Sequence, residues 1–221
     1  MNGSNDKKGL ITVLKDGPYM VKNVNDFINS KGKAISSKST MALCRCGKSS
    51  KKPFCDGTHI KVNFDGKKDQ NRIPDKVDTY KGKDITIHDN RGVCSHFGYC
   101  SDELPSVWGM KKKPWINPDG SSVKKIINIC EKCPSGALSY NLPNENRIQN
   151  VKGRDEQISI SPRRYDADGP YNITGSIELK DPDGAAPESQ EHYTLCRCGA
   201  SKNKPFCSGE HWHVKFIDDD N

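Results

Sequence analysis

Cysteines are the side chains of this sequence with the clearest capacity for chemistry, and there are ten of them in 221 residues. Cys44, Cys46 and Cys55 lie close together, and His59 follows Cys55 by four positions. Three thiolates and one imidazole form a sulfur-rich donor set that suits zinc or an iron–sulfur cluster. A helical turn beginning near Asp56 would place Cys55 and His59 on one face. These four side chains are therefore predicted to hold a metal centre.

The spacing of the first two ligands bears on the kind of metal centre. Structural zinc sites usually begin with two cysteines separated by two to four residues. Here only Arg45 separates Cys44 from Cys46, which is short for a knuckle around one ion and suits two ligands on a larger core. The spacing favours a cluster, with zinc as the alternative.

The same pattern occurs twice. At an offset of 152 residues, positions 16–64 align without a gap with positions 168–216. Such a constant register indicates an internal duplication. The second set of ligands consists of Cys196, Cys198, Cys207 and His211.

The segment from Cys44-Arg45-Cys46-Gly47 to Pro53-Phe54-Cys55-Asp56-Gly57-Thr58-His59 resembles the signature of the CDGSH iron–sulfur family, to which mitoNEET belongs. The resemblance implies one 2Fe–2S cluster on Cys44, Cys46, Cys55 and His59, and a second on Cys196, Cys198, Cys207 and His211. The second copy departs from the family pattern at Ser208 and Glu210. Because serine also caps helices well, we expect its ligands to be retained.

Residues 79–141, between the copies, contain a different set of cysteines. Bacterial-type ferredoxin sites read C-x2-C-x2-C and close with a remote Cys-Pro. Cys94, Cys100 and Cys133-Pro134 fit that pattern, but Phe97 stands where the second cysteine is expected. Three cysteine ligands suit a 3Fe–4S cluster, and a fourth ligand from elsewhere would allow a 4Fe–4S cluster.

This middle segment also resembles the divergent single-cluster ferredoxin-type domain. The resemblance rests on Cys94-Ser95-His96-Phe97-Gly98-Tyr99-Cys100, on Pro114-Trp115-Ile116 and on Cys133-Pro134-Ser135-Gly136-Ala137-Leu138. The role of Cys130 stays open. It continues the apolar stripe of Val123, Ile126 and Ile127, which predicts a helix face in the core. Cys130 is therefore either a core residue or the fourth ligand, and His96 is a further candidate ligand.

Short elements must position these ligands. Residues 10–14 and 158–160 are predicted strands, each followed by a Gly-Pro turn. We expect a β-rich α+β fold with CDGSH-type modules at 1–78 and 142–221 and a small ferredoxin-like α+β module at 79–141. In single-motif relatives two chains pair, each giving strands to a shared β-cap. The resemblance thus implies a monomer containing an intramolecular pseudo-dimer with a β-cap.

Composition limits the function. Only 33% of residues are hydrophobic, which favours small modules stabilised by metal. The net charge is +7, but the lysines are scattered with few aromatics among them, so we expect a solvated surface and no nucleic-acid site. The sequence predicts no signal peptide and no membrane span, hence a cytoplasmic protein in which clustered cysteines bind metal.

The expected function is that of an electron carrier, a cluster transfer protein, or both, with a redox partner or an apo acceptor protein. Because His59 and His211 titrate near neutral pH when free, we expect these ligands to be proton-sensitive. We expect no enzyme, since the sequence has no nucleophile elbow, P-loop or dinucleotide fingerprint. The alternative is a zinc-binding interaction module without a redox role.

Overall fold

The computed structural model describes residues 8–148, 153–219 and 221. These residues form three small sheets and a few short helices, so the β-rich α+β class is confirmed. Within the described residues, no helix combines the length and the apolar character that crossing a membrane requires.

The first sheet contains three strands of the first copy and one of the second. Its order is β10 (Glu178–Lys180), β1 (Leu10–Val13), β2 (Tyr19–Lys22) and β4 (Thr40–Leu43). Alternate residues along β1 and β2 are buried, as period-2 apolar patterning dictates. The added strand, β10, runs parallel to β1, with Ile11 opposite Leu179.

The second sheet mirrors this arrangement. Its order is β11 (His192–Leu195), β9 (Tyr171–Thr174), β8 (Gln157–Ile160) and β3 (Asp26–Ile28). Here β3 comes from the first copy and runs parallel to β8. Because β3 and β10 are equivalent at the 152-residue offset, the copies exchange the same strand, and each sheet is completed by the other copy.

The copies differ in the connection between their first two strands. Strands β1 and β8 confirm the predicted strands, with their ends shifted by about one residue. The connection to the next strand covers residues 14–18 in the first copy but residues 161–170 in the second. The second copy therefore carries a loop five residues longer, just before the region that aligns without a gap.

The third sheet belongs to the middle segment. Its strands are β5 (Val77–Lys81), β6 (Thr86–Asn90) and β7 (Leu138–Asn141), which lie side by side in that order, and each pairs with its neighbour in antiparallel fashion. Helix α3 (Val123–Lys132) packs on β7 and contacts helix α2 (Tyr99–Glu103). Short 3₁₀ turns lie at Arg91–Val93 and Pro118–Gly120.

Helix α3 follows the predicted stripe. Ile126 and Cys130 are buried, whereas Val123 and Ile127 are partly buried against the core. Ile129 is also buried, which the predicted stripe did not include. The apolar face is wider than four residues suggest because α3 packs against both β7 and α2.

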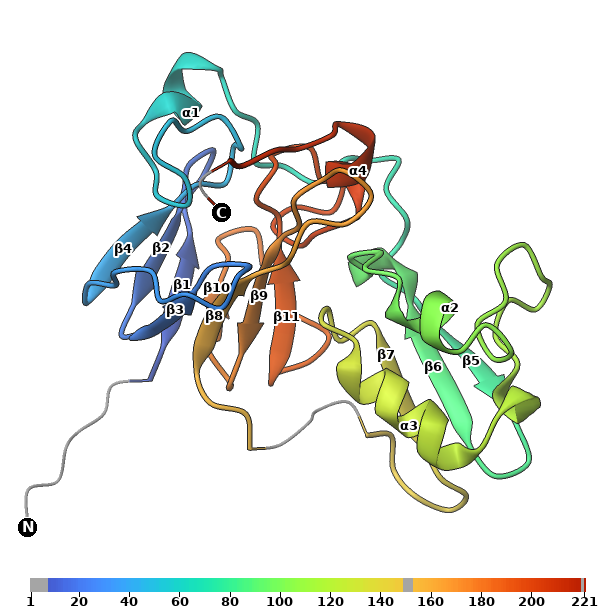
Figure 1. The fold of residues 1–221 in the computed structure, drawn as a ribbon. Helices are drawn as coiled ribbons and strands as arrows, with labels where there is room; N and C mark the ends of the chain where they lie inside the picture. The colour runs from blue at the N-terminus through green and yellow to red at the C-terminus, as the bar shows by residue number, and fades with distance from the viewer. Residues whose placement is uncertain (1–7, 149–152, 220) are drawn as a thin grey trace, which may run out of the picture.

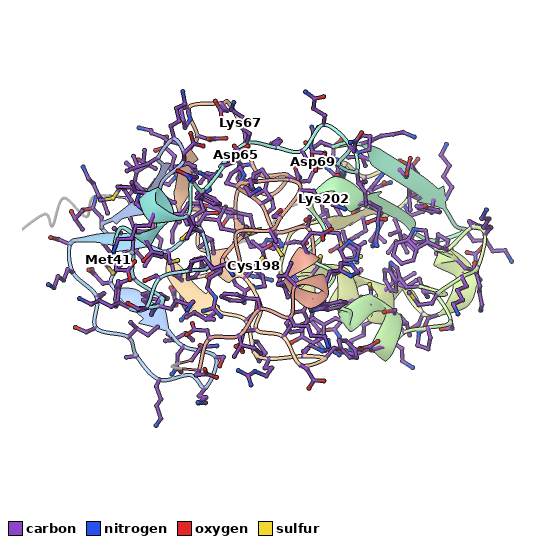
Figure 2. All side chains as sticks on the ribbon, turned by 90° about the horizontal axis from the view of Figure 1, so that it is seen from above. Met41, Asp65, Lys67, Asp69, Cys198 and Lys202 are labelled. Carbon is purple, nitrogen blue, oxygen red and sulfur yellow. The ribbon has the colours of Figure 1, made fainter. Side chains whose placement is uncertain are left out.

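The order of the three parts in space differs from their order in sequence. Figures 1 and 2 show the second copy between the first copy and the middle segment. The connection at 65–78 runs over the second copy, where the Asp69 amide donates to the Lys202 carbonyl at 2.8 Å (Figure 2). Arg72 Nε donates to Asn203 Oδ1 at 3.1 Å. This connecting segment is thus packed against the second ligand loop.

Candidate metal centres

The first set of predicted ligands is brought together at the end of β4. Cys44 Sγ lies 3.8 Å from Cys46 Sγ. Cys55 Sγ lies 3.3 Å from Nδ1 of His59, which is in helix α1 (Thr58–Lys61). The four donors therefore form two pairs, one of two thiols and one of a thiol and an imidazole.

The second set repeats this geometry. The Cys196 and Cys198 sulfurs are 3.8 Å apart, and Cys207 Sγ lies 3.5 Å from Nδ1 of His211 in helix α4 (Glu210–His213). In each copy a glycine amide also donates to the third cysteine at 3.4 Å, from Gly57 and from Gly209. The duplication thus preserves the donor geometry as well as the residue types.

Paired donors suit a core with two metal ions. Two thiolates on one tetrahedral ion with bonds of about 2.3 Å are about 3.8 Å apart, which matches both cysteine pairs. No three or more His, Cys, Asp or Glu side chains in the described parts of the chain are grouped closely enough to hold a single metal ion. The residues present fit a two-iron cluster with one donor pair for each iron.

A loop contact explains how the second copy tolerates serine in place of aspartate. Asp56 does not cap the helix directly, because α1 begins two residues later, at Thr58. Its carboxylate accepts from the amides of Thr58 and Ser50. In the second copy Ser208 Oγ accepts from the Lys202 amide, the residue equivalent to Ser50. Ser208 therefore retains the bond that closes the ligand loop.

Each pair of neighbouring cysteines contains one thiol poised to ionise. A hydrogen bond from Cys44 lowers the pKa of Cys46 to about 6, while the pKa of Cys44 itself is raised by the same bond. In the second copy the bond from Cys198 lowers the pKa of Cys196 to about 6. Since thiolates are the metal ligands, one ligand in each copy is available near neutral pH.

The two histidines differ in their surroundings. His59 is half-buried and lines an open hollow of about 530 Å³. His211 is 5% exposed, and burial, assisted by the neighbouring His96 and Arg197, lowers its pKa to about 4. The second imidazole is therefore held in the neutral form that binds metal, and water reaches it less easily.

Two tyrosines link the ligand loops of the copies. The Tyr19 hydroxyl lies 3.0 Å from the Cys196 carbonyl and 2.9 Å from the Pro205 carbonyl of the other copy. The Tyr171 hydroxyl lies 3.1 Å from the Cys44 carbonyl and 3.0 Å from that of Pro53. The two buried rings also meet edge to face. Each copy thus holds the other's ligand loop.

The two Cys-x-Cys-Gly loops pack back to back. Gly47 adopts a φ of +72°, and a Cβ there would overlap the Cys198 carbonyl. A Cβ on Gly199 would overlap the Cys46 carbonyl in the same way. In each case the glycine of one loop lies against the backbone of a predicted cysteine ligand in the other loop.

The middle segment brings three of its four cysteines to one small cavity. Cys94, Cys100 and Cys133 line a small space of about 30 Å³. They come from the end of the turn at Arg91–Val93, from helix α2 and from the end of helix α3. Burial raises the pKa of Cys94 to about 11 and that of Cys100 to about 12, so a metal must displace protons to bind there.

The two other candidate ligands lie elsewhere. Cys130 is 3% exposed and belongs to the apolar core, and it does not line the cavity of the three cysteines. His96 is absent from that lining as well and borders a separate hollow with Cys94 and Cys100. The structure thus separates Cys130 and His96 from the space that the three cysteines share.

His96 instead faces the second copy. A Cβ on Gly209 would be 2.9 Å from Cδ2 of the His96 ring. Gly209 lies between two predicted ligands, Cys207 and His211, and His96 is two residues after the predicted ligand Cys94. This contact therefore places the ligand sets of the middle segment and the second copy side by side.

The longer loop of the second copy strengthens this connection. Arg164 pairs with Asp102 and donates to the Phe97 carbonyl. The Tyr165 ring packs edge to face on Trp212, with centroids 5.2 Å apart. Arg164 and Tyr165 belong to the longer loop that the first copy lacks. A comparison of the two copies before residue 16 would have indicated this insertion.

The family comparisons agree with this geometry. The family described as "Iron-binding zinc finger CDGSH type" matches residues 16–60 and 168–212. The family described as "Divergent 4Fe-4S mono-cluster" matches residues 80–143. The chain belongs to the CDGSH iron–sulfur family. Its two CDGSH repeats flank a divergent 4Fe–4S mono-cluster domain, and these domains support a general role in binding iron–sulfur clusters.

Curated relatives of this CDGSH protein include the uncharacterized protein YjdI of Escherichia coli K12 and that of strain O157:H7. Each is 38% identical over 61 residues, which is 28% of this chain and 80% of the relative. No solved structure matches.

Two histidines outside the predicted ligand sets lie in β-sheets, next to polar side chains. His88 bridges Thr79 and Asn141 on the third sheet. His192 is buried in β11, where its Nδ1 is 3.1 Å from Ser189 Oγ.

Proposed function

We propose that this CDGSH protein is an electron carrier with three clusters, and that it is a carrier and not an enzyme. The proposed cofactors are a 2Fe–2S cluster in each CDGSH repeat and a 3Fe–4S or 4Fe–4S cluster in the mono-cluster domain. The single observation that carries the proposal is the physical continuity of the three ligand sets. They occur in the spatial order first repeat, second repeat, mono-cluster domain.

Two contacts support electron exchange along that order. Backbone packing of Gly47 on Cys198 places the two repeat sites next to each other. The His96–Gly209 contact places the second repeat next to the middle site. The second repeat therefore takes the central place in a chain of three clusters.

We further propose that the repeats form an intramolecular pseudo-dimer with a β-cap, within a monomer. The reciprocal strands β3 and β10 support this arrangement, because each completes the sheet of the other repeat. The crossed hydrogen bonds of Tyr19 and Tyr171 support it independently.

A redox partner of acidic character fits the groove between the repeats. Cys46 and Cys198 both border this groove, of about 580 Å³, together with Lys48, Lys204 and Lys215. Positive side chains beside both ligand loops would attract a negatively charged docking surface and speed encounter at low ionic strength.

Cluster transfer is a second candidate function, favoured by the exposure of His59. Protonation of an imidazole ligand releases it from iron, and His59 lines an open hollow whereas His211 is buried. We expect an acceptor to receive the cluster of the first repeat before that of the second. Below pH 6, the visible absorption of a variant holding only the first repeat cluster should therefore fade faster than that of a variant holding only the second.

Electron paramagnetic resonance of the reduced protein tests the carrier function. Neighbouring reduced clusters interact magnetically, so we expect broadened signals from the second repeat and the middle site. Cys198→Ser should remove this interaction from the middle signal, whereas the matched change Cys46→Ser should leave it. A middle signal that is identical in all three proteins would contradict the proposed path.

A further inference from the structure

Asp89 is a buried acid in the middle segment. It lies on β6, is 1% exposed and lines the same cavity as Cys94, Cys100 and Cys133. Neither of its carboxylate oxygens has a hydrogen-bond partner in the described structure. A buried carboxylate without partners costs several kcal/mol, so it calls for a counterpart such as a metal.

Arg91 is the nearest cation, but its geometry does not satisfy Asp89. Arg91 Nε lies 3.9 Å from Asp89 Oδ2, beyond the range of about 2.7–3.2 Å for such a hydrogen bond. The guanidinium stacks on the Trp115 ring at 4.7 Å, and its Nη1 approaches Cys94 Sγ at 3.5 Å. Arg91 is therefore directed toward Cys94, and it forms only a long ion pair with Asp89.

The alternative fourth ligands are placed less well. Cys130 lies in the apolar core and does not line the cavity. His96 packs on Gly209 of the second repeat. Of the six candidate ligands, Cys94, Cys100, Cys133 and Asp89 line one space, whereas Cys130 and His96 do not line it.

We propose that Asp89 is the fourth ligand of the middle cluster, binding iron through a carboxylate oxygen beside Cys94, Cys100 and Cys133. This inference rests on the proposed function, in which the mono-cluster domain holds a cluster. A fourth ligand at Asp89 favours a 4Fe–4S cluster over a 3Fe–4S cluster. A carboxylate is a harder donor than a thiolate and suits soft iron–sulfur centres less well, so the iron at Asp89 is the one most readily lost.

Iron and acid-labile sulfide, counted in anaerobically purified full-length variants, test the assignment. The wild type and Cys130→Ala should each hold about 8 iron and 8 sulfide per chain. Asp89→Ala should hold about 7 iron with 8 sulfide, and its oxidised form should show the paramagnetic signal of a three-iron cluster. Unchanged iron and an unchanged spectrum in Asp89→Ala, or loss of the middle cluster in Cys130→Ala, would overturn the proposal.

Substitution of Asp89 by cysteine distinguishes a ligand role of Asp89 from a purely structural role as the partner of Arg91. Asp89→Cys should retain about 8 iron with a shifted spectrum of the reduced middle cluster, because a thiol can bind iron but cannot replace a carboxylate beside a guanidinium. A lower iron content in Asp89→Cys than in the wild type would overturn the assignment. If the wild type itself held only about 4 iron, the middle module would bind no cluster, and the proposed function would fail with it.

Discussion

Substitution of Gly47 by alanine probes the back-to-back contact that joins the two repeats. Gly47 has a φ of +72°, and its added Cβ would overlap the backbone of Cys198. Gly32 offers a matched control, because its φ is +74° and nothing lies within 4 Å of the position of its added Cβ. The two substitutions share the conformational penalty and differ only in the overlap.

The magnitudes follow from these two contributions. An alanine in the left-handed region costs about 1–2 kcal/mol at either position. Overlap with packed backbone adds about 1–3 kcal/mol at Gly47 alone. For a chain of this size, 1 kcal/mol shifts the thermal midpoint by about 2–4 °C. We therefore expect Gly32→Ala to lower the midpoint by about 4 °C and Gly47→Ala by about 10 °C.

Anaerobic thermal unfolding, followed by far-ultraviolet circular dichroism and visible absorption, measures both effects. Because the overlap lies between the repeats, Gly47→Ala should reduce the retention of both repeat clusters, and Gly199→Ala should behave in the same way. Equal midpoints for Gly47→Ala and Gly32→Ala would refute the contact between the ligand loops. Selective loss of the first repeat cluster alone would refute its reciprocal nature.

Three further predictions concern other contacts. Tyr171→Phe removes the hydroxyl donor that the buried Cys44 carbonyl shares with the Pro53 carbonyl, so it should lower the free energy of unfolding by about 1–3 kcal/mol in thermal or denaturant unfolding; an unchanged stability would show that water replaces the hydroxyl. Arg164→Ala removes the ion pair with Asp102 from the longer loop, and it should weaken the magnetic interaction between the middle and second clusters without changing the iron content; an unchanged interaction would show that the loop does not set their distance. Burial lowers the pKa of His192 to about 4. As the pH falls below about 6.5, the unfolded chain therefore binds a proton at this histidine before the folded chain does. The free energy of unfolding should decrease between about pH 6.5 and pH 4, by about 2 kcal/mol at pH 5. The variant His192→Gln should show a smaller difference in thermal midpoint between pH 8 and pH 5 than the wild type, and an equal difference would contradict the assigned pKa.

Local spacing was sufficient to predict the ligand sets of the repeats. The cysteines of the Cys-x-Cys pair, the third cysteine and the histidine are close in sequence, so a strand end and one helical turn bring them together. The predicted stripe of α3 likewise depended on neighbours three and four residues apart. The repeat itself indicated that the second set would adopt the same geometry.

The arrangement of the three parts depended on contacts distant in sequence. Strands β3 and β10 have only three residues each, and nothing in so short a segment specifies a partner in the other repeat. The polar segment at 65–78 resembled a free linker, although its backbone and Arg72 bond to the second ligand loop. Residue types alone therefore did not predict that the second repeat would be central.

Asp89 was missed for a similar reason. In the sequence it is one acidic residue in a short strand of mixed polarity, a pattern typical of an exposed sheet edge. Only the folded chain places it across from Leu138 and beside the cavity of the three cysteines. Burial beside the three cysteines, which made the residue informative, cannot be read from its type.

The metal and sulfide content of the anaerobically purified wild type distinguishes an iron–sulfur protein from a zinc protein. Two 2Fe–2S clusters and one 4Fe–4S cluster predict about 8 iron and 8 acid-labile sulfide per chain, with no zinc. Zinc without sulfide would contradict the account, because the ligand sets would then belong to a zinc-binding interaction module without a redox role.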